Sequence, residues 1–251
     1  MPIIIANTVY RDMLYFFRNQ FTSIVMLAIL TALISVILKH MLSPDSQQLI
    51  ALNNSTYISD ITDINLQQLV RHISAEQQCI LLQASAAKTL AILVGNVILV
   101  AGLLTMINLI SNNQSVSVLR AISLSIPLLP RLLVLIFLIT LLVQLGLLLI
   151  IVPGVLLAIA FSLAPIIATR DNLSTIKSMH ISTKMAFTNV RLLAPAVLFW
   201  LLAKAVVLLL MTQCTFMSLL IAEILLNGLS NLISALLLIY LYRLYMLLPQ
   251  N

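Results

Sequence analysis

The sequence predicts an all-α protein, a polytopic membrane helix bundle with six transmembrane helices. Its composition is the first reason, because 62% of the residues are hydrophobic and only 8% are charged, which is typical of a chain embedded in a bilayer. The second reason is an uncharged segment from Leu132 to Thr169. As one helix it would extend about 55 Å, whereas the hydrocarbon core of a bilayer is only about 30 Å thick. We therefore expect two crossings, joined at the helix-breaking dipeptide Pro153–Gly154.

Six apolar segments are long enough to be spans. The first is longer than the apolar core of a signal peptide, and no small-residue cleavage site follows it, so we expect it to remain as an uncleaved span. Residues 1–251 then form a single integral membrane domain. The predicted spans are Phe21–Leu38, Thr89–Ile110, Leu132–Val152, Val155–Thr169, Leu192–Thr212 and Ser218–Leu241.

Basic residues set the orientation, because positively charged loops remain in the cytoplasm. With six spans and both termini cytoplasmic, nine basic residues lie inside and three outside. If Leu132–Thr169 crossed only once, the basic residues at 170–191 would lie outside, so the charges support the hairpin independently of its length. The inside set is Arg11, Arg18, Arg120, Arg131, Arg170, Lys177, Lys184, Arg191 and Arg243, and the outside set is Lys39, Arg71 and Lys88.

The longest segment between spans, residues 39–88, is predicted to form a helical cap on the outer side. Apolar residues at 66, 69, 70 and 73 follow the spacing of an amphipathic helix. The pattern Ser-Ala-Glu-Gln at 74–77 is a capping box, which predicts the start of a long helix that continues into the second span. Cys79 and Cys214 map to this side, and whether they form a disulfide stays open, because a bridge needs Cα atoms within about 7 Å.

Each outward-going span follows a segment with basic residues at helical spacing. Before the fifth span, Lys177, Lys184 and Arg191 share one arc of a helical wheel with His180. This pattern predicts an amphipathic helix in the membrane interface whose basic side chains reach lipid headgroups. The neighbouring apolar arc holds Ile176, Met179, Ala186, Phe187 and Val190. The candidate headgroup-binding residues are Arg11, Arg18, Arg120, Arg131, Arg170, Lys177, Lys184 and Arg191.

Two interpretations of these segments stay open. The chain contains three repeated units of interfacial helix, outward span and return span, or basic residues simply accumulate on the cytoplasmic side of any such protein. In the first segment, an apolar row accompanies Arg11 and Arg18, as the repeat requires. This row is Tyr10, Leu14, Phe17 and Phe21.

Polar side chains inside spans are the default functional candidates, because burying a charge there costs about 2.5–3.5 kcal/mol on insertion scales. Lys204 and Glu223 lie at matching depth in the fifth and sixth spans, where they could pair. Asn227 and Asn231 continue a polar stripe along the sixth span. Two explanations stay open: interhelical hydrogen bonds with a lysine that snorkels outward, and a polar pathway or proton site.

Small residues recur along the second span and predict close helix packing. Residues of this size let two helix backbones approach each other. The set is Ala87, Ala91, Gly95 and Gly102.

Residue patterns for catalysis are absent from the sequence. The glycines form no phosphate-binding loop, the histidines show no metal-ligand spacing, and no G-x-S-x-G motif occurs. We therefore predict no enzyme activity, no cofactor and no metal. The net charge of +6 does not indicate nucleic acid, because the basic residues lie beside apolar spans. Membrane lipids with anionic headgroups on the cytoplasmic leaflet are the expected partners.

Five segments carry a family resemblance: VYRDMLYFFRNQF at 9–21, LLQASAAKTL at 81–90, LIFLITLLVQLGLLLIIVPG at 135–154, APAVLFWLLAK at 194–204 and SNLISALLLIYLYRLYML at 230–247. In this order, over nearly the whole chain, they resemble the YciC family of uncharacterised enterobacterial inner-membrane proteins. The resemblance implies a multi-pass protein of the bacterial cell inner membrane. It implies no catalytic residue.

The sequence thus predicts a multi-pass inner-membrane protein of unknown molecular function, with a structural or regulatory role and contacts to anionic lipids. The alternative is a small transporter or permease with a polar site around Lys204 and Glu223. A water-accessible cavity at these two residues would favour transport, whereas a closed, dry bundle would argue against it.

Overall fold

The computed structural model describes residues 6–43, 75–112, 114, 117–213 and 219–248. Over these residues the regular structure is helical throughout, and six helical stretches are long and apolar enough to cross a membrane. The predicted all-α fold and the number of spans are therefore confirmed. The chain divides into two compact units, one comprising Met1–Leu33 with Leu93–Asn251 and the other Ile34–Ile92, and we treat them separately.

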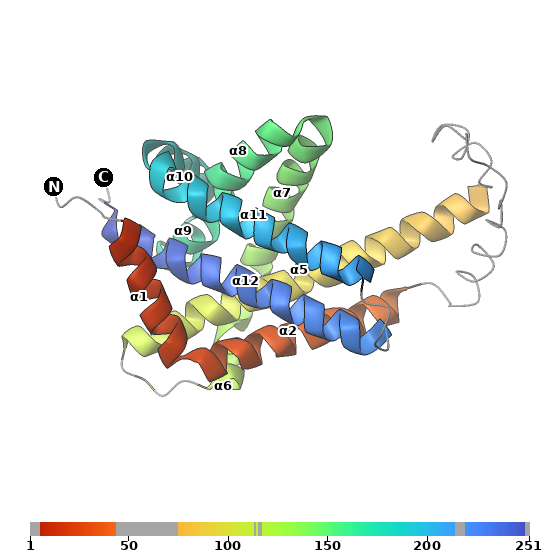
Figure 1. Cartoon of the computed structure of the whole chain (residues 1–251), viewed down its shortest axis with the longest axis horizontal. Helices are drawn as coiled ribbons and strands as arrows, with labels where there is room; N and C mark the ends of the chain where they lie inside the picture. The colour runs from red at the N-terminus through yellow and green to blue at the C-terminus, as the bar shows by residue number, and fades with distance from the viewer. Residues whose placement is uncertain (1–5, 44–74, 113, 115–116, 214–218, 249–251) are drawn as a thin grey trace. The chain divides into compact units, whose positions relative to one another are not determined.

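In the described part of the chain, the helices follow one another in three groups, each a short helix followed by two long helical stretches (Figure 1). This is the order that the three-unit repeat predicts. The first group is α1 (Ala6–Asn19), α2 (Phe21–Leu42) and α5 (Ala75–Ser111). The second is α6 (Val118–Ser125) with the 3-10 turn η1 (Ile126–Leu128), α7 (Leu129–Leu149), and α8 (Ile151–Phe161) with α9 (Ala164–Arg170). The third is α10 (Thr175–Thr188), α11 (Val190–Gln213) and α12 (Leu219–Leu247).

Most of these helices are longer than the apolar segments that predicted them. The helix of the last span, for example, continues to Leu247, six residues beyond the predicted end at Leu241. A helix continues through polar and aromatic residues at the membrane interface, where hydropathy alone ends the span. The prediction therefore located the apolar centre of each span better than its ends.

The third and fourth spans fold back on each other as the hairpin α7–α8, but the break does not lie at Pro153–Gly154 as predicted. It lies at Ile150, whose extended backbone (φ −156°, ψ 141°) separates the two helices. Pro153 stands instead in the first turn of α8. A proline is accepted there because the N–H that it lacks would have had no helical acceptor.

Gly146 and Gly154 flank this break by four residues on each side and let the two backbones touch. A Cβ atom on Gly146 would lie 2.9 Å from the Gly154 Cα, and one on Gly154 would lie 2.6 Å from the Leu147 backbone nitrogen. Neither distance leaves room for a methyl group. Gly154 is helical, with no positive φ, so its role is close packing of α7 on α8 and not the chain reversal that the sequence suggested.

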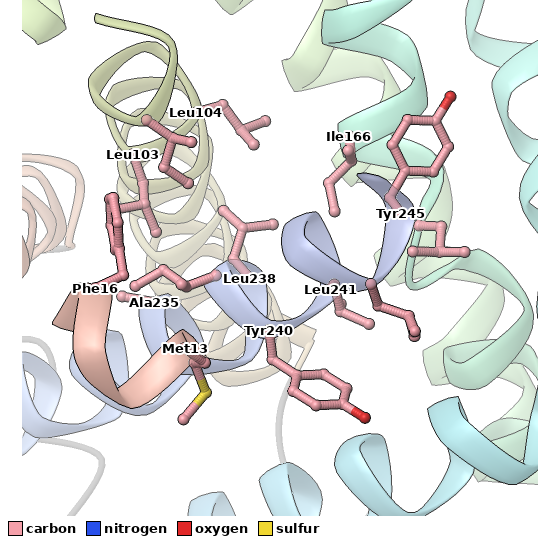
Figure 2. Packing of buried hydrophobic residues seen from close by; sticks show 14 of the residues in the cluster. Met13, Phe16, Leu103, Leu104, Ile166, Ala235, Leu238, Tyr240, Leu241 and Tyr245 are labelled. Carbon is pink, nitrogen blue, oxygen red and sulfur yellow. The ribbon is translucent and has the colours of Figure 1, made fainter. Parts of the chain in front are cut away.

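Helix α12 lies at the centre of the larger unit. Figure 2 shows Leu238 of α12 between Leu103 of α5 and Ile166 of α9, and Met13 of α1 beside Tyr240. Between transmembrane helices such contacts are stabilised by van der Waals packing. The hydrophobic effect contributes little there, because lipid tails are as apolar as the side chains themselves. The C-terminal half of α12 is largely buried in this way, whereas its N-terminal half exposes residues such as Leu225.

The smaller unit contains the last turns of α2 and the first turns of α5. Helix α5 begins at Ala75 and continues without a break to Ser111, so the helix that the capping box predicts does enter the second span. Met41 and Leu82 are largely exposed. The predicted amphipathic helix at 66–73 lies outside the described residues.

Candidate functional site

The first candidate region is the amphipathic helix α10, one arc of which is fixed to the bundle. Ser178, Met179, Ser182 and Ala186 are buried on this arc. The Ser182 hydroxyl donates a hydrogen bond of 2.7 Å to the Ala160 carbonyl of α8. A buried hydroxyl that pairs with another helix sets the rotation of its own helix, because losing the bond would leave a polar group unsatisfied.

That rotation directs the basic arc away from the bundle. Lys177, His180 and Lys184 are all exposed. The neighbouring apolar arc divides: Met179 is buried in the bundle, whereas Ile176 is 76% exposed. Helix α10 therefore offers cations with an exposed apolar side chain beside them, which is the composition of an interfacial helix.

Arg191 does not belong to α10, contrary to the wheel that placed it on one helix with Lys177 and Lys184. Helix α10 ends at Thr188, and Asn189 leaves the helical region before α11 begins at Val190. Arg191 therefore lies in the first turn of α11, where it is exposed. The seven-residue spacing continues across a break between two helices, so spacing alone could not separate them.

Helix α1 packs through a face next to the one that the sequence suggested. Val9, Met13 and Phe16 are buried, whereas Tyr10 and Leu14 of the predicted apolar row are exposed. The same row continues into α2, because the ring of Phe17 in α1 meets that of Phe21 at the start of α2 edge to face, with the ring centres 5.4 Å apart. The basic pair at 11 and 18 is exposed.

The two arginines of the second group lie in different environments. Arg120 is exposed on α6, whereas Arg131 is half-buried in the first turn of α7. One guanidinium nitrogen of Arg131, Nη2, is buried without a hydrogen-bond partner among the described residues. Arg131 is thus partly enclosed by the helices, whereas the basic side chains of α1 and α10 are exposed.

A polar cluster joins the end of α9 to the end of α12. The Tyr245 hydroxyl donates a 2.6 Å hydrogen bond to the Asp171 carboxylate. The guanidinium of Arg170 lies 5.6 Å from the centre of the Tyr245 ring and close to the Met246 sulfur. Arg243, one turn earlier on α12, lies 5.4 Å from the centre of the Phe16 ring of α1. Arg170 and Arg243 thus pack on aromatic rings as well as carrying charge.

Of the polar candidates inside the spans, Asn231 has the most clearly defined contacts. It is buried, and its side-chain amide donates to the Thr31 hydroxyl at 3.0 Å and to the Ala28 carbonyl at 3.3 Å. It therefore joins α12 to α2. Glu223 and Asn227 are half-buried on the preceding turns of α12.

The Lys204 ammonium lies over the ring of Trp200, 5.0 Å from its centre and on the same helix. The Trp200 indole N–H donates to the Ser234 hydroxyl of α12 at 3.4 Å, and that hydroxyl donates to the Ser230 carbonyl at 3.1 Å. Lys204, Trp200 and Ser234 thus form one polar seam between α11 and α12. The pairing of Lys204 with Glu223 stays a prediction.

The small residues of α5 are buried at all four predicted positions. In the larger unit, a Cβ atom on Gly102 would lie 3.1 Å from a methyl carbon of Leu27 on α2. Ala87 and Ala91 belong to the smaller unit. Close approach at Gly102 is what a small residue in a helix interface provides.

Among the described residues, no three His, Cys, Asp or Glu side chains gather in a group that could hold a metal ion. Cys79 is exposed and has no disulfide partner among the described residues. Cys214 lies outside the described residues, so the question of a disulfide stays open.

Comparison with known proteins assigns the sequence of this chain to a family. Residues 1–247 match the family described as an uncharacterised protein family, UPF0259. The chain belongs to this family. The UPF0259 membrane protein of Sodalis glossinidius is 72% identical over 250 residues, which is 100% of both chains. The UPF0259 membrane protein of Serratia proteamaculans is 51% identical over 249 residues, 99% of both chains, and that of Yersinia pestis is 50% identical over 251 residues, 99% of this chain and 97% of its own.

These matches confirm the resemblance to YciC, which is a UPF0259 member, and identify the protein as a bacterial membrane protein. No solved structure matches the chain.

Sequence reasoning missed several polar contacts of α12. Tyr240, Tyr245 and Asp171 were not singled out, although tyrosines near the end of an apolar run are typical of the membrane interface. Trp200 is the chain's one tryptophan, and its position one turn before Lys204 was an available signal. Ser178 and Ser182 were missed because serine on an amphipathic helix is usually assigned to the polar face.

Proposed function

We propose that this UPF0259 protein is a structural or regulatory protein of the bacterial inner membrane that binds anionic phospholipids through its basic helices. Helix α10 carries the proposal. Its serine-lined arc is fixed to the bundle, and Lys177 and Lys184 are exposed on another arc. Basic residues near a membrane surface gain about 1 kcal/mol each from anionic headgroups.

The proposal includes an orientation with both termini in the cytoplasm and the Ile150 break in the periplasm. The distribution of nine basic residues against three supports it. The test is a pair of reporter fusions. Alkaline phosphatase inserted after Ile150 should be active, and green fluorescent protein at the C-terminus should fluoresce. The opposite pattern would overturn the orientation.

Transport through the region of Lys204 and Glu223 has less support. The contact of the Lys204 ammonium with Trp200 accounts for its position without a pathway. A cavity that borders this region is lined mainly by apolar and aromatic side chains, which suits an apolar occupant better than a polar solute. We therefore favour lipid binding.

The decisive experiment removes the charge of α10 without removing its side chains. We expect Lys177→Gln/Lys184→Gln to retain less phosphatidylglycerol than the wild type when the purified protein is titrated with this lipid and analysed by native mass spectrometry. The matched control is Lys177→Arg/Lys184→Arg, which keeps the charge and should bind as the wild type does. Equal retention by all three proteins would overturn the proposal.

A further inference from the structure

The larger unit contains an apolar groove between α1 and the hairpin α11–α12, with a volume of about 510 Å³. Tyr10 and Leu14 of α1 form one wall, Phe199 and Trp200 of α11 the second, and Tyr240 is part of the α12 wall. Phe199 is 74% exposed, so one side of the groove opens to the surroundings of the protein. This volume is within the range of about 300–1,000 Å³ that is typical of small-molecule sites.

The groove has two chemically different ends. Because α11 and α12 are antiparallel, Pro195 and Tyr240 mark one end and Ala203 and Ile233 the other. From Pro195 to Ala203 the wall of α11 rises about 12 Å. The first end is near the start of α11 and the end of α12, and the second lies deep within the two spans.

On both α11 and α12, an arginine lies next to the first end of the groove along the helix. Arg191 precedes Pro195 by one turn of α11, and Arg243 follows Tyr240 by one turn of α12. Arg243 is held above the Phe16 ring, which ties it to α1. Helix α1, which forms one wall of the groove, also carries two exposed arginines, Arg11 and Arg18, against one acidic residue, Asp12. The charge at this end is therefore complementary to an anion, whereas the groove itself is complementary to a hydrocarbon chain.

We propose that the groove binds one acyl chain of an anionic phospholipid, with its headgroup at Arg191 and Arg243 and its chain running along Trp200 toward Ala203. Two bonds hold the walls in place for this occupant. The Trp200 indole is fixed by Ser234, and the Tyr240 hydroxyl donates to the Leu192 carbonyl at 3.2 Å. The inference deepens the proposed lipid binding and rests on it for the class of headgroup, but it concerns a different part of the surface from α10.

Trp200 is the chain's one tryptophan, so its fluorescence reports on the groove directly. The experiment reconstitutes the full-length protein in bilayers that contain phospholipids with brominated acyl chains, which quench a tryptophan on contact. Brominated phosphatidylglycerol should have a relative binding constant at Trp200 about 30-fold above that of brominated phosphatidylcholine, the change that corresponds to about 2 kcal/mol for two arginines. Arg243→Gln should reduce this preference to about fivefold, the contribution of one arginine.

The matched control moves the reporter to a lipid-facing site outside the groove. Trp200→Phe combined with Phe137→Trp uses an exposed aromatic position on α7, where the two lipids should quench equally. Ala203→Phe, which fills the deep end of the groove, should also abolish the preference at Trp200. Because this variant adds volume, its fold is checked by thermal unfolding, and Arg243→Gln provides the test if it fails to fold.

Equal quenching by the two lipids at Trp200 would overturn the inference. So would weak quenching together with a chain-to-chain crosslink from a photoreactive residue at Phe199, since a second copy would then occupy the groove. Lys177→Gln/Lys184→Gln should leave the preference at Trp200 unchanged. The two proposals can therefore fail separately. If the Lys177 and Lys184 variants retain as much phosphatidylglycerol as the wild type but the preference at Trp200 is present, only the α10 proposal fails; if the preference at Trp200 is absent, the groove proposal fails.

Discussion

The two hairpins of the larger unit, α7–α8 and α11–α12, solve the same packing problem in different ways. In α7–α8 the backbones meet at Gly146 and Gly154, and the turn between the helices is one residue, Ile150. In α11–α12 the helices are joined by side chains, through Trp200 with Ser234 and through Tyr240 with the Leu192 carbonyl. Figure 1 shows α11 and α12 side by side, with the α7–α8 hairpin at a steep angle to them.

The difference indicates which hairpin is available for a ligand. Helices that touch through glycine leave no space between them, and the apolar side chains at the tip, such as Leu148, point outward. Helices that touch through large aromatic side chains leave an irregular surface, and the groove beside α1 is lined by those aromatics. The α7–α8 hairpin is thus suited to hold the bundle together, and the α11–α12 hairpin is suited to bind a ligand.

The largest effect should come from Gly154→Ala. The new Cβ would lie 2.5 Å from the Leu147 Cγ and 2.6 Å from its backbone nitrogen, so α8 would have to move off α7. We expect the free energy of unfolding to fall by about 3 kcal/mol, measured by denaturation in detergent micelles. Gly228→Ala is the control, because the nearest atom to its Cβ is 3.8 Å away and alanine favours the helix. Equal stability of both variants would refute the packing role of Gly154.

A smaller loss is expected for Tyr245→Phe, which removes the 2.6 Å hydrogen bond to Asp171. A hydrogen bond to a charged acceptor contributes about 1.5 kcal/mol. The same denaturation assay measures it, and Asp171→Asn in the Tyr245→Phe background should add little. If the two changes were fully additive, the bond would not be the source of the effect.

Asn231→Leu should cost still less, about 0.6–1.5 kcal/mol, the range for hydrogen bonds between transmembrane helices. The change breaks the bonds to Thr31 and the Ala28 carbonyl. A double-mutant cycle with Thr31→Val isolates the pair. A coupling energy of zero would show that the bond between Asn231 and Thr31 contributes nothing to the attachment of α12 to α2.

Lys204→Met should change the free energy of unfolding least, by no more than about 0.5 kcal/mol. The lost contact with the Trp200 ring is offset by the removal of a charge from an apolar span. Thermal unfolding and a growth assay of the gene replacement would be measured together. A large loss of stability would support a pair between Lys204 and Glu223, whereas a growth defect with unchanged stability would favour the transport hypothesis.

The sequence was sufficient for features that depend on apolar length and charge. The six spans follow from long apolar segments with at most one charged residue each, and the hairpin follows from Leu132–Thr169 being too long for one crossing. Helix α10 was likewise visible in the spacing of Lys177 and Lys184. These patterns are local, so no knowledge of neighbouring helices is needed to interpret them.

Features that depend on contacts between distant segments could not be predicted. Proline and glycine suggested a turn at 153–154. The break lies instead at Ile150, and Gly154 lies where α8 touches the α7 backbone. The bond from Tyr245 to Asp171 joins residues that are 74 positions apart. The groove was invisible because α1, α11 and α12 each contribute only part of its wall.

The central position of α12 has a consequence for biosynthesis. It follows in the chain every helix that it contacts, from α1 and α2 to α9 and α11. During translation these earlier segments enter the membrane before the helix that packs them together has left the ribosome. Until then Leu103, Ile166 and Thr31 face lipid or a chaperone, and a stalled or shortened chain would be a substrate for membrane proteases.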